Sequence, residues 1–64
     1  MTLQRARELI EERSQGMGGY NRNAVRGVLA EVGREHGWDV VDGLIREYDL
    51  EARFEIKEGV QINP

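Results

Sequence analysis

Residues 21–36 read NRNAVRGVLAEVGREH, and this stretch decides the fold. Four aliphatic residues in it recur at offsets of three and four positions, which places them on one side of an α-helix: Val25, Val28, Leu29 and Val32. Asn21 or Asn23 can cap the start of such a helix, and the residue that follows it, Gly37, is of the type that most often closes one. The pattern predicts a helix over residues 22–36 as the central element of the fold.

Small residues gather on the other side of this predicted helix, at Gly27, Ala30, Gly33 and Gly37. Each glycine inside a helix costs about 0.8 to 1 kcal/mol relative to alanine. A flat side allows another backbone to approach closely, so we expect a helix of the same chain or of a second copy to pack against Gly27 and Ala30. A bulky residue at position 27 is then expected to disrupt that packing.

Two further helices are predicted on either side of the central one. Over residues 2–14 the apolar positions recur at helical spacing, with Thr2 as the cap. Over residues 39–49 the expected cap is Asp39, and Asp42 stands where a capping box has its second acceptor. The segment between the first two helices carries three glycines within four positions, which predicts a loop.

The apolar period changes after residue 49. Apolar and charged residues alternate there, with Leu50, Ala52, Phe54 and Ile56 as the apolar members. A period of two is typical of a strand, Gly59 can turn the chain, and Val60 and Ile62 resume the alternation. The predicted fold is therefore mostly α: three short helices followed by a C-terminal strand or short β-ribbon over residues 50–62, in a single domain over residues 1–64.

Length and composition limit how this fold is stabilised. A core of 64 residues supplies about 3 to 5 kcal/mol, and the chain has no cysteine and one histidine. Disulfides and a Cys/His metal site are thereby excluded, which leaves self-association or a partner protein as the source of additional stability. No apolar run exceeds three residues, and the start of the chain has no apolar signal region, so a cytoplasmic protein without a membrane span is expected.

The glycine-rich loop and the residues after it are a weak candidate for anion binding. Tyr20, Arg22 and Arg26 lie in a stretch, residues 13–30, that contains no acid, whereas the net charge of the whole chain is −3. Arg22 stands at the positive end of a helix dipole, so a negative group is expected beside it. The loop follows a helix and lacks the glycine patterns of phosphate-binding loops, which favours a plain helix connection.

Catalytic and metal-binding patterns are not found. Ser14 is the sole serine and no cysteine exists, so no nucleophile, base and orienting group can be assembled. Asp39 and Asp42 are explained by capping, and His36 by its position at a helix end. Trp38 is interpreted as a core residue, with an interface anchor as the alternative. We therefore expect no enzyme activity, no cofactor and no metal.

These observations favour a small non-catalytic accessory or regulatory protein that binds and modulates a larger protein as a homodimer; an inhibitor would share these features. The exposed edge of a β-ribbon favours pairing with another chain. The expected partner contacts are Phe54, Ile56, Val60, Ile62, Gly27 and Ala30. The alternative is nucleotide or nucleic-acid binding through the glycine-rich loop with Arg22 and Arg26, although nucleic-acid binders usually carry net positive charge.

Overall fold

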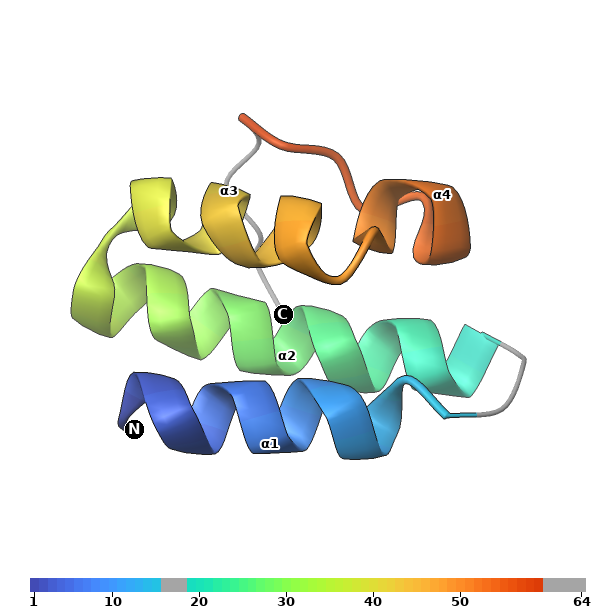
Figure 1. Cartoon of the computed structure of the whole chain (residues 1–64), viewed down its shortest axis with the longest axis horizontal. Coiled ribbons are helices and arrows are strands. Elements are labelled where there is room, and N and C mark those ends of the chain that lie inside the picture. Colours follow the sequence, from blue (N-terminus) through green and yellow to red (C-terminus); the bar gives the residue numbers. More distant parts are fainter. Residues whose placement is uncertain (16–18, 60–64) are drawn as a thin grey trace.

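The computed structural model describes residues 1–15 and 19–59 of the chain. The helices, in chain order, are α1 (Leu3–Arg13), α2 (Gly19–His36), α3 (Trp38–Glu47) and α4 (Leu50–Phe54). α2 lies between α1 and α3, contacts both, and runs antiparallel to each (Figure 1). The expected central position of this helix is confirmed. None of the described helices combines the length and apolar composition needed to cross a membrane.

The first two helices begin in different ways. α1 starts as predicted, because the Thr2 hydroxyl accepts a hydrogen bond of 3.1 Å from the Arg5 backbone N–H. α2 begins at Gly19, ahead of the predicted start, so Asn21 and Asn23 lie inside the helix and do not cap it. The Asn21 amide instead donates to the Gln15 carbonyl oxygen at 2.6 Å. This bond joins the first turn of α2 to the chain that follows α1.

The start of α3 depends on a glycine and not on the predicted aspartate cap. Gly37 has φ 97° and ψ 158°, a combination that side chains disfavour strongly, and it directly precedes the helix. Asp39 lies in the first turn of α3, which has no side-chain cap. Asp42 does not complete a capping box; its Oδ1 accepts a 2.9 Å hydrogen bond from the Gly59 backbone N–H. It therefore holds the segment after α4 against α3.

The predicted C-terminal strand is wrong. Residues 50–54 form α4, and the described ranges contain no strand. Leu50 and Phe54 are four residues apart, a spacing that a period of two and a helical turn satisfy equally well, and both are buried. Ala52, which a strand would have buried with them, is exposed. The Val60 and Ile62 part of the predicted ribbon lies outside the described residues.

Two residues in the left-handed region set the position of α4. Asp49 (φ 55°) separates α4 from α3, and Glu55 (φ 58°) ends α4. The reversal at Glu55 returns the chain to the core, where Ile56 is buried and its N–H lies 3.4 Å from the Leu50 carbonyl oxygen. Buried apolar residues from all four helices, together with Ile56, form a single cluster.

The small side of α2 is used at Gly33 and not at Gly27. A Cβ at Gly33 would lie 2.3 to 2.5 Å from three ring atoms of Trp38, so the indole packs directly on the α2 backbone. At Gly27, apart from the adjoining backbone of α2, no atom of residues 1–15 or 19–59 lies within 4 Å of the same position, and the residue is exposed. The close approach predicted for this side is therefore made by a side chain from α3, and the expected packing at Gly27 does not occur.

Gly33→Ala should lower the free energy of unfolding by about 1 to 3 kcal/mol, because the new methyl group displaces Trp38 from α2. Gly27→Ala is the matched control in the same helix: it should raise that free energy by up to about 1 kcal/mol, since only helix propensity changes there. Urea unfolding followed by circular dichroism measures both. A gain in stability for both variants would contradict the direct contact between Gly33 and Trp38.

Candidate functional site

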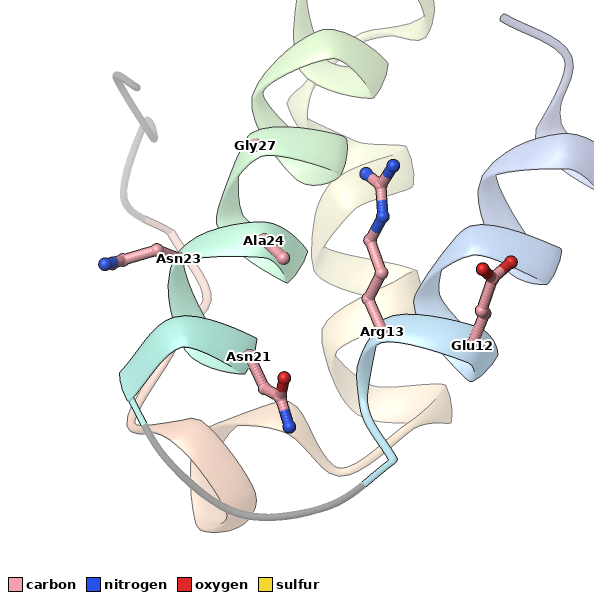
Figure 2. Close-up of a pocket in the computed structure, with 6 residues that line it drawn as sticks. All are labelled: Glu12, Arg13, Asn21, Asn23, Ala24 and Gly27. Atoms are coloured by element: carbon pink, nitrogen blue, oxygen red, sulfur yellow. The ribbon is translucent and has the colours of Figure 1, made fainter.

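A polar groove of about 540 Å³ lies between the end of α1 and the first half of α2. Its lining consists of Glu12 and Arg13 from α1 and Asn21, Asn23, Ala24 and Gly27 from α2 (Figure 2). We call it the Gly27 groove. Position 27 has no side chain and none of the described residues packs over it, so they leave the backbone of α2 accessible there. The groove therefore joins an open stretch of backbone to four polar side chains.

The polar groups of the Gly27 groove are of several kinds. Glu12, Arg13 and Asn23 are exposed, and Asn21 is half-buried. A carboxylate accepts hydrogen bonds, a guanidinium donates them, and an amide does both. A surface of this composition matches the alternating donors and acceptors of a peptide main chain. It offers general recognition chemistry, with no nucleophile paired to a base among the residues that line it.

The structure separates the predicted partner-binding residues. Gly27 is exposed and lines the groove. Ala30, Phe54 and Ile56 are exposed by 0%, 9% and 4% respectively and belong to the core of the same chain. The two other predicted contacts, Val60 and Ile62, lie outside the described residues. Among the predicted contacts that the structure describes, Gly27 is thus the one at the surface.

Arg22 has a partner within the fold. Its Nε donates a 2.7 Å hydrogen bond to the carbonyl oxygen of Phe54, the last residue of α4. In place of the anionic group expected beside Arg22, the described partner is a neutral helix-end carbonyl, a group that arginine side chains commonly bind. Arg26, one turn further along α2, is half-buried and forms no hydrogen bond or ion pair with the described residues. The side chain of Tyr20, the third predicted residue, lies outside the described part.

A second arginine bond to a carbonyl joins α4 to the end of α1. Arg53 Nη2 donates to the Ser14 carbonyl oxygen at 2.7 Å, and its guanidinium lies 5.3 Å from the ring centroid of Phe54. We call the bonds from Arg22 and Arg53 the arginine clamp. Sequence reasoning missed Arg53, because a residue expected to alternate outward from a strand gives no sign of a contact with Ser14. The clamp fixes the end of α1 and the start of α2, which lie side by side, to α4.

Ion pairs link the helices at the surface. Arg7 on α1 binds both carboxylate oxygens of Glu47 on α3, each at 3.2 Å. The hydrogen bond from Arg7 lowers the pKa of Glu47, and the same bond raises the pKa of Arg7. Burial raises the pKa of the neighbouring Tyr48. Arg46 pairs with Glu58 at 3.2 Å and so supports the segment after α4. Each of these ion pairs links two segments of the fold.

The first residue is bound to the end of α2. The Met1 α-amine lies 2.5 Å from Glu35 Oε2, and His36 Nε2 lies 2.7 Å from the Met1 carbonyl oxygen. The hydrogen bond from the amine lowers the pKa of Glu35, and this bond also raises the pKa of the amine. His36 is thus a helix-end residue with a backbone partner. Over residues 1–15 and 19–59, no three His, Asp or Glu side chains are grouped to hold a metal ion.

Comparisons of the chain with protein-family models, with curated proteins and with solved structures find no match. The Gly27 groove differs from the arginine clamp and from the ion pairs described above, whose groups bind one another within the chain. The clamp has its partners inside the chain. The groove has exposed polar groups that face solvent, so it is the candidate functional site.

Arg22→Ala should lower the free energy of unfolding by about 1.5 to 3 kcal/mol, because a half-buried, charge-assisted hydrogen bond to the Phe54 carbonyl is lost. Arg26→Ala, one turn further along the same helix, is the control and should cost less than half of that. Urea unfolding of both variants tests the difference. Equal losses in the two variants would show that the bond to Phe54 contributes nothing specific.

Glu47→Gln should reduce the acid sensitivity of the fold. Because pairing with Arg7 lowers the pKa of Glu47 in the folded state, the pair stabilises the protein above about pH 4.3, the ordinary range of a glutamate, and this contribution disappears as the pH falls through the lowered pKa. Urea unfolding from about pH 7 to about pH 3 should therefore show wild type and Glu47→Gln converging at the acid end. Parallel curves over the whole range would contradict this role.

Proposed function

We propose that this chain is a small non-catalytic accessory or regulatory protein that binds and modulates a larger protein, and that it acts as a homodimer. The observation that carries the proposal is the Gly27 groove, an exposed hollow of about 540 Å³. A glycine in the middle of α2 lowers helix stability by about 1 kcal/mol, and no contact among the described residues requires its small size. An open backbone at this position serves a ligand that approaches from outside.

The ligand best matched to the groove is a peptide segment of the larger protein. Asn23 supplies an amide that pairs with a peptide main chain through both a donor and an acceptor, and Asn21 adds its amide oxygen as an acceptor while its nitrogen binds the Gln15 carbonyl oxygen. Glu12 and Arg13 give the same lining one negative and one positive group, so the groove has no excess of positive charge. A polyphosphate or nucleic-acid backbone is recognised chiefly by positive charge, which favours the peptide.

Nucleotide or nucleic-acid binding through Arg22 and Arg26 has weaker support. The Nε of Arg22 is already bonded to the Phe54 carbonyl oxygen, and an anion would compete with that bond. Net charge also disfavours this alternative, because the chain carries −3. The two hypotheses predict different salt dependence. The affinity for a phosphate backbone falls steeply between low and moderate salt, whereas the affinity of a charge-balanced groove for a peptide changes little.

Filling the groove tests the proposal. Gly27→Arg places a long side chain in the groove, and the matched control Gly43→Arg makes the same substitution on α3, where a Cβ also meets nothing within 4 Å. Immobilised wild type and Gly43→Arg should capture the same protein from cell extract. Gly27→Arg should bind that protein at least about tenfold more weakly. Circular dichroism confirms that all three chains are folded.

Retention of every captured protein by Gly27→Arg at wild-type affinity would refute binding in the Gly27 groove. The homodimer part has its own measurement, the solution mass by light scattering over a concentration series in low and moderate salt. A mass that stays at that of one 7.3 kDa chain at the highest concentration would refute it.

A further inference from the structure

The junction between α3 and α4 holds a non-glycine residue in the left-handed region. α3 ends at Glu47, α4 begins at Leu50, and Asp49 between them has φ 55° and ψ 43°. Non-glycine residues take this conformation in only a few per cent of cases, because Cβ approaches the following carbonyl oxygen. Aspartate tolerates it better than most, yet a right-handed helical conformation would be less strained. Tyr48, with φ −103° and ψ 7°, lies beside the right-handed helical region, so Asp49 is the residue whose backbone must change most for the two helices to join.

A continuous helix is the evident alternative conformation of this segment. Residues 38–54 contain no proline, and seven of the eleven residues from 44 to 54 are good helix formers. In a continuous helix with about 3.6 residues per turn, Leu50 and Phe54 would lie on the side opposite Val41, Leu44 and Ile45. They would leave the core of their own chain, in which they are buried now.

We propose that α4 is an exchangeable element, and that two copies of the chain form a dimer by straightening the junction at Asp49 and placing α4 in each other's core. In the dimer, Leu50, Phe54 and Ile56 of one copy occupy the site that the other copy's own residues fill in the monomer. Arg22 of the second copy again binds the carbonyl of Phe54, and Arg53 again binds the carbonyl of Ser14. The burial of α4 and both bonds of the arginine clamp are thus re-formed between copies.

Release of α4 opens two surfaces, one on α4 and one on the core it leaves, and a second copy of the chain covers both. Release of α4 exposes the apolar side chains of Leu50 and Phe54 and opens the apolar cluster in which they are buried. It also leaves the arginine clamp without its carbonyl partners. α4 lies at one end of the molecule, beyond the end of α3, so straightening moves it outward (Figure 1). The backbone strain at Asp49 disfavours the monomer, whereas the entropy lost on association disfavours the dimer.

This inference extends the homodimer part of the proposed function and is independent of the Gly27 groove. Asp49→Gly removes the strain of the left-handed conformation and should favour the monomer, whereas Asp49→Ala disfavours that conformation and should favour the continuous helix. Each chain is refolded from denaturant at high concentration, diluted in steps and measured by light scattering after size exclusion. The dimer dissociation constant of Asp49→Gly should be higher than that of Asp49→Ala by about tenfold for each hinge, or about a hundredfold for the two hinges of a dimer.

Two control variants separate the exchange from other causes. Glu55→Gly relieves the same kind of strain at the far end of α4, where monomer and exchanged dimer have the same conformation, so its dissociation constant should equal that of wild type. Adding Gly27→Arg to Asp49→Ala should leave the dimer intact, because the groove is not part of the exchange. An Asp49→Ala chain that is monomeric over the range tested, or that does not fold, would overturn the proposal.

Discussion

The packing of α2 between α1 and α3 is the interaction on which the rest of the structure depends. Helices shorter than about 12 to 15 residues are marginal in water, and α1 and α3 have 11 and 10 residues. Each of them persists because its apolar stripe is buried against the aliphatic residues of α2. The 18 residues of α2 thus supply the surface on which both neighbours form, and the order of the remaining elements follows from that surface.

Carbonyl groups at helix ends explain the positions of two arginines that composition alone leaves ambiguous. The last carbonyls of a helix have no partner within it and carry partial negative charge. Arg22 satisfies one at the end of α4, and Arg53 satisfies the carbonyl of the residue that caps α1. With five residues, α4 has almost no stability of its own, so it depends on these bonds and on the burial of Leu50 and Phe54.

The three longer helices could be predicted from the sequence, because each has an apolar stripe repeated over several turns. The Thr2 cap could also be predicted, because its hydrogen bond is to a residue three positions away. The sequence was not sufficient for α4. Leu50 and Phe54 fit a strand and a helix equally well, and the deciding feature is the backbone conformation of Asp49, which depends on the core that Leu50 enters. The Gly27 groove was equally hidden, since Glu12 and Arg13 meet α2 only through the packing of α1.

The two glycines of α2 that share one side of the helix show how a single pattern can have two physical causes. Gly33 is required within the chain, because the positive φ of Gly37 turns α3 back so that Trp38 packs on the α2 backbone. Gly27 faces solvent, and no described side chain requires the space it leaves. In a fold whose core supplies only about 3 to 5 kcal/mol, a mid-helix glycine is a substantial loss of stability. Packing among the described residues explains the glycine at position 33 and leaves the one at position 27 without a structural reason, and the proposal of ligand binding in the Gly27 groove starts from that difference.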